Sequence, residues 1–128
     1  MSMTPAEMRA AILAQIRAWE HGDAEALAAG FTSDGEIVVA GKHITGHIAL
    51  RATVTRFASR HADVQVTVRR MLCGDASAAV EYRWEDTRLE TGERYLADDA
   101  VWVDFEGGLI RRWREYWDAE TPKQEAGS

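Results

Sequence analysis

The sequence has a single cysteine, Cys73, and it contains no long run of apolar residues. One cysteine cannot form a disulfide within the chain, and this suits a reducing compartment. A membrane span needs about 18 consecutive apolar residues, and the N-terminus has no signal-peptide core. These absences predict a cytoplasmic protein without a membrane span.

Basic residues are the minority among the charged side chains. The chain has 15 Lys and Arg against 21 Asp and Glu, and its net charge is -6. Nucleic acids and anionic membrane surfaces both require a clustered excess of positive charge. We therefore expect neither nucleic acid nor a membrane as a partner.

Cofactor and metal motifs are also missing. The histidines show no paired ligand spacing, and the sequence has no cysteine cluster, phosphate loop, dinucleotide fingerprint or GxSxG motif. We expect no cofactor and no metal site.

The length of 128 residues and the hydrophobic fraction of 46% indicate one globular domain over residues 1–128.

Helical signals fill the first half of the chain. Thr4 and Glu7 form a capping-box pattern that predicts a helix from residue 5 to about residue 20. Gly22 ends this helix, and Asp23 can cap a second short helix over 24–30. Apolar spacing predicts a third helix over 47–60. The expected apolar stripes of the first and third helices are Met8, Ile12, Ile16 and Trp19, and Leu50, Val54 and Phe57.

Strand signals fill the second half. A short strand over 36–41 precedes a possible partner over 42–45, and four long strands follow over 62–72, 76–90, 93–105 and 109–118. Helices followed by hairpin-connected strands predict an α+β fold, with the helices on one face of a strongly curved antiparallel sheet. Residues 5–118 form the expected core, and residues 119–128 form a polar tail.

The segments "GDAEALAAGFTSDGEIVV" and "EGGLIRRWREYWD" carry a family resemblance. Together with the capped first helix and the long hairpin, they resemble the SnoaL-like branch of the nuclear-transport-factor-2-like (NTF2-like, cystatin-like α+β cone) superfamily. The resemblance implies a cone with one deep pocket, often in a dimer that uses the outer sheet face. It also implies activities such as polyketide cyclase, ketosteroid isomerase and limonene-epoxide hydrolase.

The last strand contributes one wall of the implied pocket. Strict alternation separates Leu109, Arg111, Trp113, Glu115 and Trp117 from Ile110, Arg112, Arg114, Tyr116 and Asp118. The resemblance places Trp113, Glu115 and Trp117 inside the cone. Glu115 then stands where cyclase-like and hydrolase-like relatives carry a catalytic acid, although a structural ion pair is the alternative.

The hairpin between 76–90 and 93–105 leaves two registers open. A two-residue turn at Thr91 and Gly92 pairs Trp84 with Asp99 and Tyr82 with Val101, which gives a mostly apolar inner face.

A three-residue loop with a glycine bulge would instead place Arg83 opposite Asp99. That arrangement resembles the acid–arginine–acid site of limonene-epoxide hydrolases, with Arg83, Glu85 and Glu115 as its members. The cost of burying Glu81, Arg83 and Glu85 together favours the first register. The resemblance places Asp99 inward in both registers.

These patterns yield a functional hypothesis and an alternative. The first is a cofactor-free acid–base enzyme of the cyclase, isomerase or epoxide-hydrolase type, acting on a small, largely apolar or polycyclic molecule. The alternative is a non-catalytic binding or assembly module, and a homodimer through the outer sheet face is expected in both cases.

The resemblance places His43 and His47 near the cone mouth, where they are either proton shuttles or surface and loop residues. The candidate catalytic residues are Asp99, Glu115, Arg83 and Tyr82. The candidate substrate-binding residues are Ile16, Trp19, Phe31, Ile37, Val39, Val54, Phe57, Trp84, Val101, Trp113 and Trp117.

Overall fold

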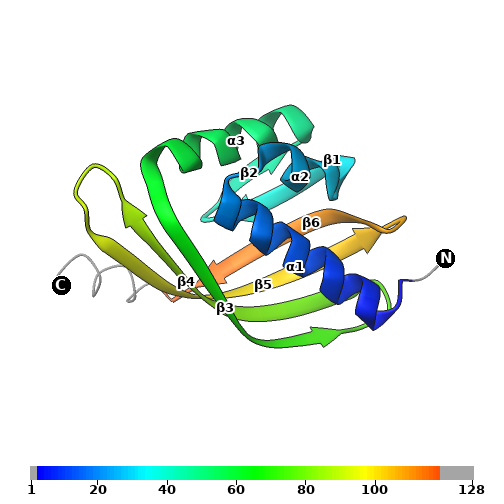
Figure 1. The fold of residues 1–128 in the computed structure, drawn as a ribbon. Helices are drawn as coiled ribbons and strands as arrows, with labels where there is room; N and C mark the ends of the chain where they lie inside the picture. The colour runs from blue at the N-terminus through cyan, green and yellow to red at the C-terminus, as the bar shows by residue number, and fades with distance from the viewer. Residues whose placement is uncertain (1–2, 119–128) are drawn as a thin grey trace.

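A computed structural model describes residues 3–118 of the chain, so the polar tail predicted at 119–128 lies outside the described residues. Three helices lie on one face of a single curved sheet of six strands (Figure 1). This arrangement confirms the predicted α+β class. The elements are α1 (Pro5–His21), α2 (Ala24–Ala29), β1 (Phe31–Val39), β2 (Lys42–Thr45), α3 (His47–Arg60), β3 (His61–Cys73), β4 (Ser77–Arg88), β5 (Arg94–Glu106) and β6 (Leu109–Trp117).

The caps of the first two helices form as the sequence predicts. The Glu7 backbone N–H donates to Thr4 Oγ1 at 3.1 Å, and the Thr4 N–H donates back to the Glu7 carboxylate at 2.8 Å. Gly22 closes α1 in the left-handed conformation, with φ of 65°, and the Asp23 side chain accepts from Ala26 N–H at the start of α2. These bonds satisfy backbone groups that helix ends leave unpaired. These bonds define the end of α1 and therefore the position of Trp19, which lies in the last turn of that helix.

The sheet has the order β2-β1-β6-β5-β4-β3, and it is not closed. All neighbours are antiparallel except β1 and β6, which run parallel. The expectation of an all-antiparallel sheet is therefore wrong at this one pair. The strand predicted at 36–41 also begins earlier, at Phe31, because Phe31 pairs with Ile110 before a register shift leads to Glu36.

The hairpin of β4 and β5 takes neither of the two expected pairings. Tyr82 pairs with Asp99, and Trp84 pairs with Ala97. Arg88 N–H donates to the Glu93 carbonyl at 2.9 Å, so the loop has four residues, 89–92, instead of two. The register differs by two residues from the favoured expectation. Because side chains alternate with a period of two, the inner face still contains the expected residues.

The hydrolase-like register with Arg83 opposite Asp99 is wrong, since Arg83 pairs with Asp98 on the other side of the pleat. Only an odd shift of register would have exchanged the two faces of β4. Arg83 therefore lies on the face opposite Tyr82 and Trp84.

A bulge in β6 overturns strict alternation at the start of that strand. Phe105 pairs with Ile110 and Asp104 pairs with Arg112, so Arg111 is the extra residue. As a result Ile110 is fully buried, whereas Leu109 and Arg111 are exposed. Beyond the bulge the predicted inward set is correct, and Trp113 is buried in the core.

Candidate active site

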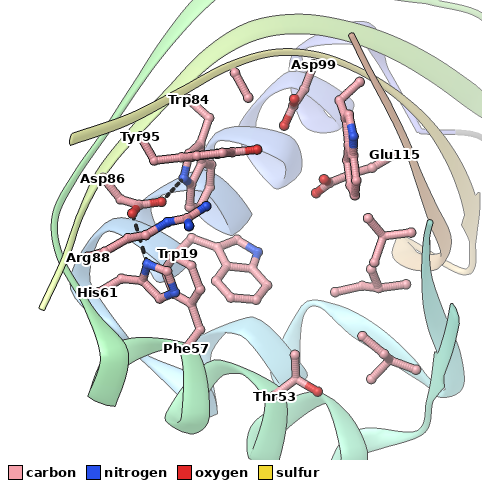
Figure 2. Close-up of a pocket in the computed structure, with 15 residues that line it drawn as sticks. Trp19, Thr53, Phe57, His61, Trp84, Asp86, Arg88, Tyr95, Asp99 and Glu115 are labelled. Atoms are coloured by element: carbon pink, nitrogen blue, oxygen red, sulfur yellow. Dashed lines mark hydrogen bonds and ion pairs between the residues drawn. The ribbon is translucent and has the colours of Figure 1, made fainter. Parts of the chain in front are cut away.

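One cavity of about 300 Å³ opens between the helices and the concave face of the sheet. It lies between α1, α3, the β1–β2 hairpin and the inner faces of β4, β5 and β6 (Figure 2). Most of its wall is aliphatic or aromatic, and its polar groups gather at two sides. The lining residues are Trp19, Ile37, Val39, Ile44, Thr53, Phe57, His61, Trp84, Asp86, Arg88, Tyr95, Ala97, Asp99, Glu115 and Trp117.

Two carboxyl groups meet at one side of the cavity. Asp99 in β5 pairs with Trp117, and its neighbour Val101 pairs with Glu115, so the two acids are diagonal neighbours on one face. The Glu115 atom Oε1 accepts from Trp113 Nε1 at 3.1 Å and from Tyr82 Oη at 3.3 Å. Asp99 differs, because its buried Oδ1 atom has no hydrogen-bond partner within residues 3–118. Figure 2 shows both carboxyl groups directed into the cavity.

The environment of this pair separates the two acids. Burial, followed by the negative charges of Glu115 and Asp98, raises the pKa of Asp99 from 3.8 to about 8. Burial also raises the pKa of Glu115, although the Trp113 and Tyr82 donors oppose that rise. Hydrogen bonds to a carboxylate favour its charged form. The arrangement therefore favours a neutral Asp99 at neutral pH, beside a Glu115 whose Oε1 atom accepts two hydrogen bonds.

Tyr82 is held in its neutral form by the same surroundings. Burial, then the charges of Glu115 and Asp99, raises the pKa of Tyr82 well above its ordinary value. Its side chain is buried and does not line the cavity, so it acts on Glu115 from behind.

A second polar group lies on the other side of the cavity. His61 Nδ1 is 2.9 Å from Asp86 Oδ1, and Trp84 Nε1 donates to Asp86 Oδ2 at 2.7 Å. Asp86 is only 2% exposed. The His61 ring stacks on Phe57, with 4.2 Å between centroids and 10° between planes. Both Asp86 oxygens are thus occupied, and the imidazole is fixed in position (Figure 2).

Aromatic rings connect the two sides. Trp19 meets Phe57 edge to face at 5.4 Å and Trp84 at 6.1 Å. Tyr95 lies under the guanidinium of Arg88, which is 4.8 Å from the ring centroid. Such contacts hold aromatic walls in preferred orientations.

The structure divides the candidate residues into three groups. Asp99, Glu115, Trp19, Ile37, Val39, Phe57, Trp84 and Trp117 line the cavity. Tyr82, Trp113, Ile16, Phe31, Val54 and Val101 are buried in the core and do not line it, because the helix packing and the inward strand faces need them there. Arg83 faces away from the cavity, so the structure contradicts its assignment to the pocket.

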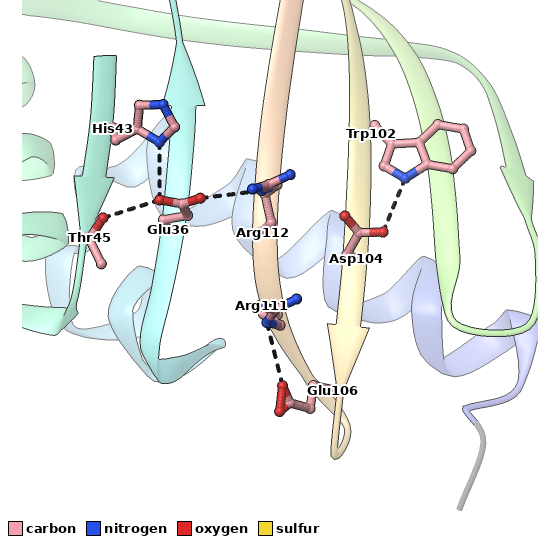
Figure 3. A network of polar contacts seen from close by, with 8 residues as sticks. All are labelled: Glu36, His43, Thr45, Trp102, Asp104, Glu106, Arg111 and Arg112. Atoms are coloured by element: carbon pink, nitrogen blue, oxygen red, sulfur yellow. Dashed lines mark hydrogen bonds and ion pairs between the residues drawn. The ribbon is translucent and has the colours of Figure 1, made fainter. Parts of the chain in front are cut away.

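The two histidines considered as proton shuttles also lie elsewhere. His43 contacts Glu36 at 3.3 Å on the sheet face away from the helices, where Arg112 holds the same carboxylate (Figure 3). His47 Nε2 is 3.0 Å from the Phe31 carbonyl. The histidine that does line the cavity is His61, which was not among the predicted site residues.

Seven lining residues were missing from the candidate list: Ile44, Thr53, His61, Asp86, Arg88, Tyr95 and Ala97. Strand alternation pointed to four of them, since Asp86 and Arg88 alternate with Trp84 on β4, and Tyr95 and Ala97 alternate with Asp99 on β5. His61 had no comparable signal, because its partner Asp86 is 25 residues away in the chain.

No group of three or more His, Cys, Asp or Glu side chains within residues 3–118 is arranged to hold a metal ion. No helix in the same range is long and apolar enough to cross a membrane.

Comparison with known proteins identifies the family of this chain. The SnoaL-like domain profile matches residues 12–113. This chain belongs to the SnoaL-like family. The search of curated proteins found no match.

Solved structures with the NTF2-like fold resemble this SnoaL-like protein over nearly its whole length. A protein with a ketosteroid isomerase-like fold from Catenulispora acidiphila, in complex with trimethylamine, has a TM-score of 0.84 and 19% identity, covering 98% of this chain and 95% of its own. An LEH-like epoxide hydrolase of M. tuberculosis has a TM-score of 0.82 and 19% identity, with coverage of 94% and 89%. TsrD from Streptomyces laurentii has a TM-score of 0.85 and 16% identity, with 98% of each chain covered. At these identities the likeness shows the fold alone.

Proposed function

We propose that this SnoaL-like protein is a cofactor-free acid–base enzyme that enolises a small, largely apolar carbonyl compound. The observation that carries the proposal is the Asp99 carboxyl group, which is buried beside Glu115 with one oxygen unpartnered. A buried polar group without a hydrogen bond is costly to the fold. A ligand oxygen that accepts a hydrogen bond from Asp99 would remove that cost.

The two acids have complementary roles in this reaction. Neutral Asp99 donates its hydrogen bond to the carbonyl oxygen and stabilises the negative charge that develops there. Glu115, whose carboxylate form the Trp113 and Tyr82 donors stabilise, removes a proton from the adjacent carbon. Tyr82 is a positioning residue in this scheme, because it reaches the reacting atoms only through Glu115.

The cavity limits the class of substrate. A volume of about 300 Å³ accommodates a molecule of two or three rings, and the walls are mainly Trp, Phe, Ile and Val side chains. Enolisation is a step that isomerases and aldol cyclases share. The outward position of Arg83 argues against an epoxide-hydrolase site formed by Arg83, Glu85 and Glu115.

Deuterium exchange tests the proposal without knowledge of the final product. Purified protein is incubated in D₂O with a panel of cyclic ketones of one to three rings, and incorporation beside the carbonyl is followed by NMR. We expect exchange above the buffer rate for the wild type, and loss of that exchange in Asp99→Asn and Glu115→Gln. Glu81→Gln is the matched control, because Glu81 pairs with exposed Arg70 away from the cavity. Exchange that persists in both pocket variants would show that other groups carry the activity.

A non-catalytic cation-binding module is the second candidate. Carboxyl groups among aromatic rings also suit an alkylammonium ion, and a structure with this fold contains trimethylamine. The two candidates differ in their response to pH. A neutral ketone needs protonated Asp99, so its binding weakens as the pH rises through about 8, whereas cation binding strengthens over the same range. Titration with a cyclic ketone and with trimethylammonium at pH 6 and pH 9 separates them.

A further inference from the structure

The enolisation scheme uses only one of the two polar sides of the cavity. The other side holds His61 and Asp86, which both line the cavity, although Asp86 is only 2% exposed. Asp86 accepts at both oxygens, from His61 at 2.9 Å and from Trp84 Nε1 at 2.7 Å. In Figure 2 this pair and the Asp99–Glu115 pair lie on opposite sides of the open space.

The contacts of His61 leave one ring nitrogen for a ligand. A carboxylate can only accept hydrogen bonds, so Asp86 requires a proton on Nδ1, which in a neutral imidazole leaves Nε2 as the acceptor. Nε2 is on the opposite edge of the ring and has no hydrogen-bond partner among the described residues. Stacking on Phe57 prevents the ring from turning freely. The result is an oriented acceptor of protons at the cavity wall.

We propose that His61 is a second catalytic group, which exchanges a proton with the substrate at a point remote from its carbonyl oxygen, and that Asp86 positions it. The proposal rests on the enolisation function and narrows its substrate class. The substrate would be an apolar cyclic enone whose conjugated system spans the cavity, with its oxygen at Asp99 and its γ carbon at His61.

The proposed step needs no further reagent. His61 Nε2 takes the proton from the γ carbon, and the electron pair of that C–H bond forms a new C=C bond. The existing C=C bond moves one position toward the carbonyl, whose π electrons pass to the oxygen. Asp99 holds this oxygen through its hydrogen bond. The dienolate then takes up one proton. Protonation at the γ carbon regenerates the starting enone, and protonation at the carbon beside the carbonyl restores the carbonyl with the double bond moved by one position, in both cases without oxidation or reduction.

A purely structural role would also account for some of these contacts. Buried Asp86 needs donors, and His61 follows directly after the last residue of α3. That role requires only a donor toward Asp86. A purely structural role does not explain why the imidazole lines the cavity, or why its Nε2 atom has no hydrogen-bond partner among the described residues. The experiment must therefore measure proton transfer as well as stability.

Exchange of deuterium into octalone, a fused bicyclic enone, separates the two sides of the cavity. In D₂O the enzyme should label both the carbon beside the carbonyl, which reports on Glu115, and the γ carbon, which reports on His61. We expect His61→Gln to lose γ exchange by about a hundredfold or more while it retains exchange beside the carbonyl. His43→Gln is the matched control, since His43 is exposed on the opposite sheet face.

Each outcome bears on one proposal or both. γ exchange that survives in His61→Gln overturns the role of His61 and leaves the enolisation function intact. γ exchange without exchange beside the carbonyl supports His61 and contradicts Glu115. No exchange at either carbon with millimolar octalone counts against both.

A second pair of variants guards against a loss of folding. In His61→Ala, added imidazole should restore γ exchange, which a structural role would not produce. In Asp86→Asn, one of the two accepting oxygens becomes an NH2 donor. Because the Trp84 N–H can only donate, the amide oxygen should stay with Trp84 and the NH2 should face His61 Nδ1, so the imidazole should move its proton to Nε2. We expect ¹⁵N NMR of labelled histidine to show this change of tautomer together with lost γ exchange. An unchanged tautomer with lost activity would contradict the positioning role of Asp86.

Discussion

The replacement Asp99→Asn should stabilise the protein, even though it removes a proposed catalytic acid. Asp99 has a pKa of about 8 in the folded protein against 3.8 ordinarily. Between those values the folded chain holds a proton that the unfolded chain has released, so folding stability falls as the pH rises. The slope is about 1.4 kcal/mol per pH unit. The ionisation of Asp99 in the unfolded chain therefore lowers the free energy of unfolding by about 4 kcal/mol at pH 7 and by about 6 kcal/mol above pH 8, as upper limits.

Asparagine is neutral at every pH, so the variant escapes this cost. The free energy of unfolding of Asp99→Asn minus that of the wild type should therefore be small at pH 4, grow through pH 7 and level off above pH 8. Urea unfolding followed by tryptophan fluorescence at several pH values measures this difference. Glu81→Gln is the control and should show no such trend, because Glu81 is well exposed. A difference that is constant with pH, or that favours the wild type at high pH, would refute the assignment of a neutral buried Asp99.

Three further predictions concern single side chains. Tyr82→Phe removes one donor to Glu115, so the pKa of Glu115 should rise further, as measured by ¹³C NMR of labelled glutamate. Trp84→Phe leaves one oxygen of buried Asp86 without its donor and should cost about 1–3 kcal/mol in urea unfolding; a smaller loss would mean that water replaces the indole N–H. Trp102 is 51% exposed on the outer sheet face (Figure 3), and we propose that this face forms a homodimer. Sedimentation should then find a dimer at micromolar concentration and a monomer for Trp102→Glu.

Local chemistry explains which parts of the fold the sequence could predict. The caps at Thr4 and Asp23 depend on residues three positions apart, so their pattern is visible in a short window. Alternation predicted the inner face of β4 and β5 although the exact pairing was wrong by two residues. An even error preserves the faces, and this is why Asp99 was correctly placed inward.

Non-local pairing explains the errors. The parallel pairing of β1 with β6 joins segments about 75 residues apart, as between Glu36 and Arg112, and no short window contains both. The bulge at Arg111 depends on how β5 meets β6 and has no signature within "LIRRWREYWD". The His61–Asp86 pair forms because α3 passes directly into β3, which sets the histidine against β4. Sequence spacing alone therefore could not reveal the second polar side of the cavity.

The contrast between the two buried aspartates argues that the partnerless carboxyl of Asp99 serves a ligand. Asp86 and Asp99 are 2% and 7% exposed, and both lie on the inner face of the same hairpin. Asp86 has a donor at each oxygen, whereas Asp99 Oδ1 has none in the part of the chain described. The indole N–H of Trp113 and the hydroxyl of Tyr82 both donate to Glu115. Since an unmet buried polar group costs stability, its retention in an otherwise well-satisfied pocket favours a site that is completed when substrate binds.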